Sequence, residues 1–532
     1  MKNSIFHEPV PNWLEKACII LLLCSQIMVS GIPTNAIALV TSFLGDEKDA
    51  IQFIYYGGIV GSMSFYPLIG RFTRYFRKRQ LLLMGIALEL VLLMLSVFTQ
   101  NDLQLFICNF LLSCVKMLCL IVCIGMLMAK FNLGNSRGLF YGIYYAFSYS
   151  LSQLYSYFVA ILLQTYSWKY TFLLSLPGIF ISLLIVVLLM HSRRMERKYP
   201  LYQVDWIGYL LFVLSSLCLS FGCIFGERLD WLRSNLICLV MAMAAIGYIL
   251  WTIRMLTIRR PYVNIRVLAT YSHVRWGVGL MVFMFFIYNT FSISTEFMKV
   301  NLGYDDSYVA ASNLYMIISF AIFIPLTGIW LHKIHRARES LFLGFLLFGV
   351  YYLYTARFFY PEENAHFFLI PMVIRGAAYG ISITSLSYYA SVNLPAHASA
   401  HRAFFSITSR SVLAAPITSA LWLDRFNYFK QKQYDIISAQ YGMDDYRVSD
   451  LWKGLVSSHL KAGSSLEQAE QLAHGSIHAM IYKEALIASA QNIYYVLAAI
   501  SIVMAIAVLC LKVLNIHYVS EKNKYPLTYV DV

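Results

Sequence analysis

Charged side chains inside apolar segments are the residues of this sequence that could do chemistry. They are Glu89, Lys116, Glu296, Arg375 and Arg410. A charge at the centre of a bilayer costs about 2.5 to 3.5 kcal/mol on insertion scales, so such a side chain tends to face a cavity or a partner. Each could bind a solute or carry a proton. The alternative is that it pairs structurally or extends to the membrane edge.

Uncharged polar side chains in the same segments form a second group of candidates. They are Gln26 and Asn35 in the first segment and Gln153 in the fifth. A hydrogen bond between membrane helices is worth about 0.6 kcal/mol on average. Such a structural role is slightly favoured over substrate contact for these residues.

The elements that hold these residues are apolar segments of helical length. The chain has 532 residues, of which 59% are hydrophobic and 13% charged, a composition that indicates a polytopic membrane protein. Fourteen segments are long enough to cross a hydrocarbon core roughly 30 Å thick. We expect an all-α fold with a six-helix bundle in 1–200, a two-helix insertion with linkers in 201–270, and a six-helix bundle in 271–532. A long extracytoplasmic loop is expected at 424–490.

Positive charge is concentrated in alternate short loops. The strongest cluster holds Arg71, Arg74, Arg77, Lys78 and Arg79. Because Lys and Arg are enriched in cytoplasmic loops, the pattern predicts that both termini are cytoplasmic. The net charge of +14 could suggest nucleic acid, but no Lys/Arg run stands apart from the apolar segments. We therefore expect contact with a lipid bilayer that contains anionic lipid, and none with nucleic acid.

One pattern occurs twice in the sequence. PLIGRFTRYFRKRQLLLMG at 67–85 and PLTGIWLHKIHRARESLFLG at 325–344 share Pro-Leu-x-Gly, a basic run and an apolar restart. Both follow the second segment of an outer block of six. Duplicated six-helix halves predict this arrangement, and they favour alternating access over a channel or scaffold.

At these residues the chain resembles the major facilitator superfamily, specifically its fourteen-helix drug/proton antiporter branch of EmrB/QacA type. The resemblance covers nearly the whole chain. Further matching motifs are Ser167-Trp168-Lys169-Tyr170-Thr171-Phe172 through Leu176-Pro177-Gly178, Asp205-Trp206-x-Gly208, the turn from Gly226 to Ser234, Arg260-Pro261, and Arg375-Gly376-x-x-x-Gly380.

The resemblance implies a gating loop after the second helix of each half. In this sequence the loops comprise Gly70, Arg71, Arg74, Arg77, Lys78, Arg79, Gly328, His332 and Arg336. Arg74 and His332 stand where the family usually has an acidic residue. Ser152, Tyr155, Val159 and Ala160 stand in place of the Gly/Pro-rich antiporter motif, and the first helix has Ser30-Gly31 where many members have an acid.

The resemblance also implies function: a proton-coupled exporter of small amphipathic molecules or drugs. It places Lys116, Glu296 and Arg375 on helices that line the central cavity, Glu89 on a peripheral helix, and Arg410 where an arginine is common. Cations outweigh acids in this set, which favours an anionic or zwitterionic substrate. Glu296 is the first candidate for proton coupling and Glu89 the second. The departures from the motifs leave open a uniporter or exchanger of a metabolite without proton coupling.

Location and partners follow from the resemblance as well. It implies a multi-pass protein of the bacterial inner membrane. Gram-negative members of the branch work with a periplasmic adaptor and an outer-membrane channel, and the loop at 424–490 could contact an adaptor. Within that loop, 466–490 has helical periodicity and predicts a small exterior helix.

Histidine spacing raises an enzymatic alternative. His332 with His335, and His397 with His401, could each place two ligands on one helical face, as in membrane-bound di-iron oxidases. Such oxidases need more histidines than this, and the ten cysteines lack metal-ligand spacing. No phosphate-binding loop is present either. The sequence therefore predicts no enzyme, no cofactor and no resident metal.

Overall fold

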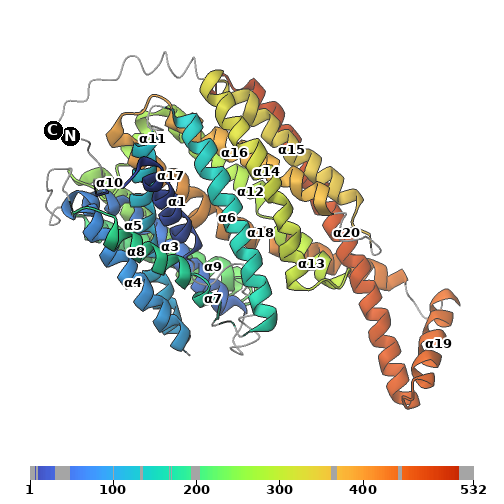
Figure 1. Ribbon diagram of the computed structural model, residues 1–532. Helices are drawn as coiled ribbons and strands as arrows, with labels where there is room; N and C mark the ends of the chain where they lie inside the picture. The colour runs from blue at the N-terminus through green and yellow to red at the C-terminus, as the bar shows by residue number, and fades with distance from the viewer. Residues whose placement is uncertain are drawn as a thin grey trace.

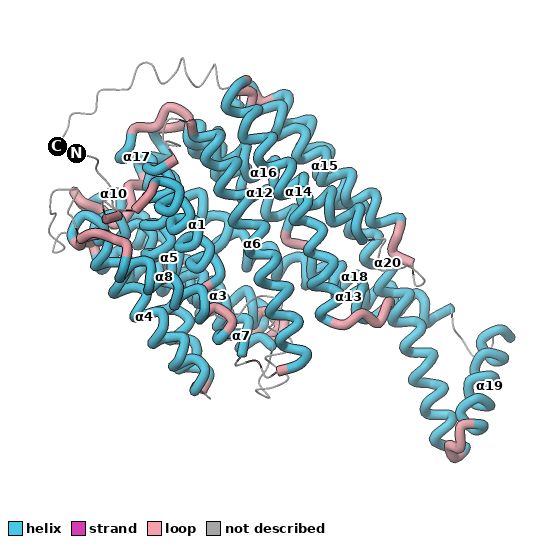
Figure 2. Tube along the Cα trace, viewed as in Figure 1, coloured by secondary structure: helices cyan, strands magenta, loops and turns pink. Residues whose placement is uncertain are grey.

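A computed structural model describes residues 6–7, 10–29, 48–99, 101–131, 136–166, 168, 170–192, 204–360, 368–440 and 446–514. The candidate Asn35 and the Ser30-Gly31 pair lie outside these residues. The described chain is almost entirely helical, and its only β-bridge pairs Phe6 with Met190 (Figures 1 and 2). The prediction of an all-α membrane fold is confirmed.

The first part of the chain forms a series of helices. They are α1 (Asn12–Met28), α3 (Lys48–Tyr75), α4 (Lys78–Phe98), α5 (Asp102–Lys130), α6 (Arg137–Thr165), α7 (Tyr170–Leu173) and α8 (Leu176–Leu188). Local sequence explains one of these starts clearly. Ser136 caps α6 by accepting a hydrogen bond from the Leu139 backbone N–H.

The middle of the chain forms a helical hairpin, α9 (Trp206–Phe225) and α10 (Asn235–Thr257), followed by the short α11 (Arg266–Thr270). Asp205 caps α9 through the Gly208 N–H at 3.0 Å. The same carboxylate pairs with Arg254 near the end of α10 at 2.8 Å. This ion pair holds the two ends of the hairpin together, as the predicted topology requires.

The last part of the chain contains the remaining elements. They are α12 (Ser272–Tyr288), α13 (Phe291–Val300), α14 (Asp306–Lys333), α15 (Ala337–Arg357), α16 (Leu369–Ser391), α17 (Ala396–Thr408), the π-helix η6 (Ser409–Ala414), α18 (Ala415–Gln440), α19 (Tyr446–Lys461) and α20 (Leu466–Cys510). The elements α17, η6 and α18 follow one another without a break.

Eleven helical segments of the described chain are long and apolar enough to cross a membrane. The segments formed by α1, by α3, and by α17 with η6 and α18 are shorter or more polar and are not among the eleven. The predicted number of fourteen spans and the cytoplasmic termini therefore stay predictions.

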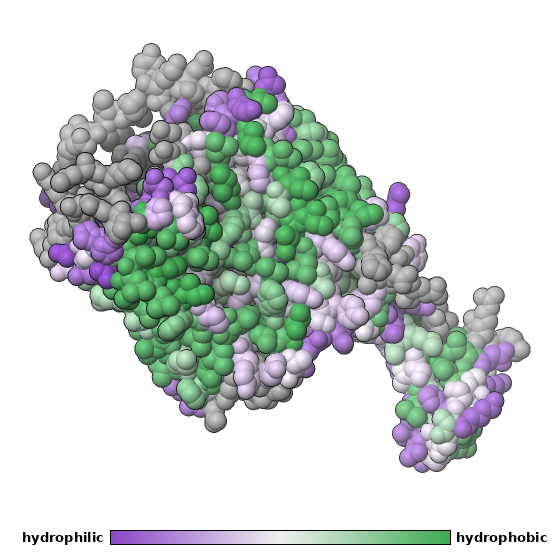
Figure 3. Space-filling view, viewed as in Figure 1, coloured by the Kyte–Doolittle hydropathy of each residue, from purple (hydrophilic) through white to green (hydrophobic). Residues whose placement is uncertain are grey.

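Two large apolar cores organise the helices. One contains residues of α1, α4, α5 and α8, and the other contains residues of α12 through α16 and α20. Helix α6 contributes to both, because Tyr144 packs against each core. Apolar side chains also cover much of the outer surface (Figure 3), including Leu88, Val91 and Leu95 on α4. A lipid environment accounts for that exposure.

Helices α6 and α14 touch backbone to backbone. A Cβ added to Gly328 would lie 2.8 Å from the Gly138 carbonyl oxygen and 2.8 Å from the Gly142 Cα. Three glycines thus permit an approach that a methyl group would prevent. The contact lies at the end of the molecule that carries the Lys/Arg-rich loops, called here the basic end.

The segment predicted as a long loop is largely helical. Helix α18 continues to Gln440, α19 follows, and α20 is one helix of 45 residues, about 67 Å at 1.5 Å rise per residue. The predicted small exterior helix is the first part of α20 rather than a separate element. Helix α19 and the first part of α20 project from the main body as a helical hairpin, called here the outer hairpin (Figure 1).

Candidate functional site

The candidate residues fall into three separate clusters. Arg375 and Arg410 share a cluster of tyrosines, Glu89 lies beside Gln26 and near Lys116, and Glu296 pairs with a lysine outside the predicted set. Gln153 is half-buried on α6 and makes no side-chain hydrogen bond within the described residues. The structure therefore does not gather the candidates into a single site.

Arg410 lies on the π-helix η6 and reaches across to α6. Its Nη1 donates a hydrogen bond to the Tyr149 hydroxyl at 3.4 Å. Wider helical turns of this kind occur often at functional sites, and here the turn joins α17 to α18. The side chain is half-buried, and within the described chain no carboxylate lies within ion-pair distance of it.

Tyr149 has an unused donor. Its oxygen accepts hydrogen bonds from Arg410 and from the Tyr379 hydroxyl, the latter at 3.2 Å. Its own O–H has no acceptor among the described residues, and a guanidinium has five N–H groups to donate. Arg410 and Tyr149 therefore present donors that an anionic group could accept.

Arg375 is held more tightly than Arg410. The side chain is only 3% exposed, its Cζ lies 4.6 Å from the Tyr288 ring centroid and 5.9 Å from that of Tyr351, and its Nη2 donates to the Tyr288 carbonyl at 3.2 Å. These are cation–π distances. Within this cage the guanidinium stabilises the packing of α12, α15 and α16.

Stacked tyrosines join the two arginines. The ring of Tyr288, beside Arg375, stacks on Tyr379 with a centroid distance of 4.3 Å. Tyr379 in turn donates to Tyr149, which accepts from Arg410. A displacement of Arg410 or Tyr149 can therefore be transmitted through Tyr379 and Tyr288 to the core of the second half.

Glu89 is fully buried in the core of the first half. Gln26 on α1 donates from Nε2 to one of its carboxylate oxygens, Oε2, at 3.1 Å. Oε1 of Glu89 and Oε1 of Gln26 are both buried and have no hydrogen-bond partner. Lys116 on α5 is half-buried and interacts electrostatically with Glu89, without forming a direct ion pair.

Glu296 lies at the middle of α13 and is paired. Its Oε1 accepts hydrogen bonds from Lys430 Nζ at 2.8 Å and from the Tyr482 hydroxyl at 3.1 Å. Burial disfavours the charged form of Lys430, but these hydrogen bonds outweigh it and raise the pKa of Lys430 above its ordinary value. The three side chains tie α13, α18 and α20 together.

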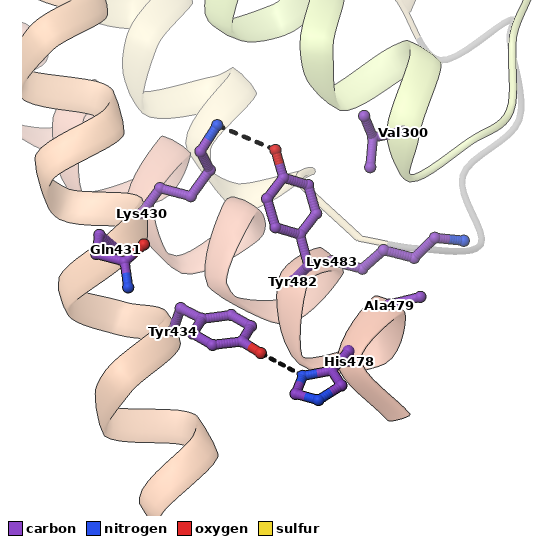
Figure 4. A pocket seen from close by; sticks show the side chains of 8 residues that line it. All are labelled: Val300, Lys430, Gln431, Tyr434, His478, Ala479, Tyr482 and Lys483. Atoms are coloured by element: carbon purple, nitrogen blue, oxygen red, sulfur yellow. Dashed lines mark hydrogen bonds between the residues drawn. The ribbon is translucent and has the colours of Figure 1, made fainter. Parts of the chain in front are cut away.

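A cavity of about 500 Å³ opens beside this group (Figure 4). Its lining includes Lys430, Tyr482, Tyr434 and His478, and the last two are hydrogen-bonded to each other. The cavity lies between α18 and α20 on the side of the outer hairpin. It is therefore separate from the tyrosine cluster between α6 and α16.

The two predicted gating loops make different contacts. In the first, Arg77 donates to Ser192 and Arg79 to the Val186 and Val187 carbonyls, while Gly70 is exposed with open space around it. In the second, Gly328 packs on α6 and His332 is hydrogen-bonded to Ser136 at 2.9 Å. Arg336 pairs with Glu339 at 3.1 Å on the surface. Of the two, only the second joins the two halves in these contacts. Arg71 and Arg74 of the first lie at the end of α3 and Lys78 begins α4, so these three are helical rather than loop residues.

Several contacts at the basic end were missed by the sequence interpretation. Arg402 is 5% exposed and donates from Nη2 to the Tyr141 hydroxyl at 2.8 Å. Gly138 and Gly142 have the small-x-x-x-small spacing of close helix pairs, so that signal was present in the sequence. His335 is hydrogen-bonded to Tyr388 at 2.6 Å. The described residues contain no metal-ligand cluster.

Comparison with known proteins supplies an independent line of evidence. The sequence profile of the Major Facilitator Superfamily matches residues 18–418. Multidrug export protein EmrB of Escherichia coli (strain K12) is 20% identical over 345 residues, which cover 64% of this chain and 64% of that protein. The probable multidrug resistance protein EmrY of the same strain is 23% identical over 297 residues, which cover 52% of this chain and 57% of that protein. The chain thus spans less than two thirds of the length of either relative.

Solved structures with a similar fold belong to transporters. A POT family transporter in complex with 5-aminolevulinic acid has a TM-score of 0.56 at 14% identity, over 94% of this chain and 96% of that chain. A structure described as giving insight into substrate recognition in proton dependent oligopeptide transporters has a TM-score of 0.55 at 14% identity, over 96% and 100% of the two chains. At this identity the similarity concerns the fold alone.

Proposed function

The chain belongs to the major facilitator superfamily, and on that premise we propose that it is a proton-coupled exporter of small amphipathic anions that works by alternating access. The family makes the chain a multi-pass membrane transporter rather than an enzyme. The direction of transport, the class of substrate and the coupling to protons are the proposed parts. The relatives named as multidrug export and multidrug resistance proteins support export.

One observation carries the class of substrate. Arg410 and Tyr149 offer donors from opposite sides of the contact between η6 and α6, and within the described chain no acid neutralises Arg410. An anionic group is the natural acceptor for such a pair, because charge-assisted hydrogen bonds are the stronger kind. Tyr145 and Tyr379 also interact electrostatically with Arg410. Their rings would pack on the apolar part of the substrate.

Alternating access accounts for the placement of this pair. Tyr149 and Arg410 belong to the two halves that the fold is expected to move against each other. An anion bound between them draws the halves together through both partners at once. The glycine contact between α6 and α14 then closes the basic end, which the predicted topology makes cytoplasmic.

Transport assays in proteoliposomes test the proposal. Lumenal pH is followed under an imposed pH gradient while anionic and cationic amphipaths of matched size are added. We expect proton movement that depends on the anion in the wild type and is lost in Arg410→Gln. Arg275→Gln, which removes an equal charge from an exposed position on α12, is the matched control.

The assay also separates the alternatives. Equal transport of anions by Arg410→Gln would remove the proposed substrate site. Substrate movement without proton movement would favour a uniporter or exchanger of a metabolite. Absence of movement for every amphipath would reject this class of substrate.

Location and partners complete the proposal. The EmrB relative supports the bacterial inner membrane as the site of action. We propose that the outer hairpin contacts a periplasmic adaptor that leads to an outer-membrane channel. The hairpin projects from the membrane body (Figure 3) and exposes Leu451, Leu460, Leu472 and Met480.

A further inference from the structure

The buried carboxyl group of Glu89 has an environment that suits reversible protonation. Glu89 lies near the middle of α4, on the face that also buries Leu82, Ile86 and Leu93. The opposite face of α4 exposes Leu88, Val91 and Leu95. The acid thus points into the core of the first half rather than toward lipid.

The hydrogen bonding around Glu89 lacks one donor. Gln26 supplies a single N–H to Oε2 and the Cys119 thiol is a weak donor beside the carboxylate, yet Oε1 of each side chain makes no hydrogen bond of normal geometry. Buried polar atoms are normally paired, so two orphan acceptors at one contact need an explanation. A proton on Glu89 would supply an O–H, because a neutral carboxyl group donates as well as accepts.

The surrounding charges permit the ionised form as well. Lys116, Cys119 and Cys123 on α5 are the titratable groups that interact with Glu89. Helices α7 and α8, which also pack on α4, contain no charged residue, and the charged residues of α3 lie at its two ends. Lys116 is thus the single cation of these elements that interacts electrostatically with Glu89, and its charge favours the ionised carboxylate.

We propose that Glu89, with Gln26 and Lys116, is the proton-binding site of this transporter, separate from the anion site at Arg410 and Tyr149. The carboxylate takes up one proton from water on one side of the membrane and releases the same proton on the other. The inference rests on the proposed function for its coupling role, whereas the protonation itself stands without it.

The geometry also supplies a route between the two sites. Gln26 lies on α1, which packs against both α5 and α6. Tyr144 of α6 packs against the core that surrounds Glu89, and Tyr149 lies further along the same helix. A change in the contact between Gln26 and Glu89 can therefore move α1 against the helix that carries half of the anion site.

Infrared spectroscopy of the purified full-length protein tests the protonation directly. The C=O band of a protonated, buried carboxyl group is followed as pH is varied. We expect a band that titrates reversibly in the wild type, is absent from Glu89→Gln, and is retained in Glu296→Gln. Glu296→Gln is the matched control because it removes the other membrane-segment acid. A band that persists in Glu89→Gln, or no titrating band in the wild type, would overturn the proposal.

Transport measurements test the coupling. Glu89→Gln should lose substrate movement driven by a pH gradient, to the level of empty liposomes, yet retain counterflow exchange of labelled for unlabelled substrate without a gradient. Retained gradient-driven transport would overturn the coupling role. If the wild type transports no amphipath at all, the proposed function fails while the infrared titration still decides the site. Glutamine is close in shape to glutamate, and retained counterflow shows that the variant is folded.

Discussion

Arg410 donates a hydrogen bond to the hydroxyl of Tyr149, and this contact joins the second half of the chain to the first. Tyr149 accepts a second hydrogen bond from Tyr379, so its own proton stays available. The pair resembles an anion-binding site, because it presents hydrogen-bond donors and no carboxylate of the described chain pairs with Arg410. Arg375, which the resemblance places on a helix lining the central cavity, instead lies inside a tyrosine cage of the second half.

Replacement of Tyr149 by Phe tests the donor. The substitution keeps the ring but removes the O–H, and a hydrogen bond to a charged group is worth about 1.5 to 3 kcal/mol. We expect apparent affinity for an anionic substrate to weaken by about tenfold to a hundredfold. Concentration-dependent uptake into proteoliposomes measures it. Tyr157→Phe, on the same helix, is the control, and equal affinities for the two variants would show that the Tyr149 proton does not contact the substrate.

Much of the fold could be predicted from hydropathy alone. Apolar runs of helical length indicated helices such as α4, α5, α9 and α10, because lipid forces each run to satisfy its backbone by forming a helix. The ion pair between Asp205 and Arg254 agrees with the predicted hairpin. The outer part of α20 was placed in a separate helix because its polar composition hides its continuity with the apolar part.

The candidate site was less predictable. The charged residues could be found from their cost in lipid, but their partners depend on how helices pack, which periodicity does not reveal. The π-helix at Arg410 has no signal in the sequence. The ion-pair partner of Glu296, Lys430, lies far along the chain in a segment predicted as loop. The spacing of Gly138 and Gly142 could be recognised in the sequence as a close-packing signal, but their contact with Gly328 could not be predicted from it.

The glycine contact predicts a conformational effect. Gly328→Ala would place a methyl group within 2.8 Å of backbone atoms of α6, and backbone cannot move aside as a side chain does. Overpacking of this kind costs about 1 to 3 kcal/mol, so the closed basic end should become less populated. Labelling of a cysteine introduced at Ser136 measures access to that end. Gly279→Ala, with open space around it, should leave labelling unchanged. Unchanged labelling in Gly328→Ala as well would mean that this contact does not close the basic end.

The pairing of Glu296 predicts a structural role. Glu296→Gln leaves Lys430 without its ion-pair partner at a site where the two side chains are 27% and 15% exposed. We expect a loss of stability of about 1 kcal/mol, near the upper end for exposed pairs. Thermal unfolding in detergent measures the loss, and the double variant Glu296→Gln with Lys430→Met should recover part of it. Full stability with loss of gradient-driven transport would return Glu296 to the coupling machinery.

The outer hairpin provides the last test, because it separates transport across one membrane from export out of the cell. Leu451 on α19 and Leu472 in the first part of α20 are 39% and 49% exposed on the outer hairpin. Changing both to Glu places charges on a surface that an adaptor would cover, and a desolvated, unpaired charge disfavours binding. We expect substrate export from whole cells to fall while transport in proteoliposomes stays at the wild-type rate. Lys453→Glu, an exposed charge change on α19, is the control. Unaffected export in the double variant would argue against an adaptor on this surface, whereas equal losses in cells and liposomes would make the hairpin part of the transport unit itself.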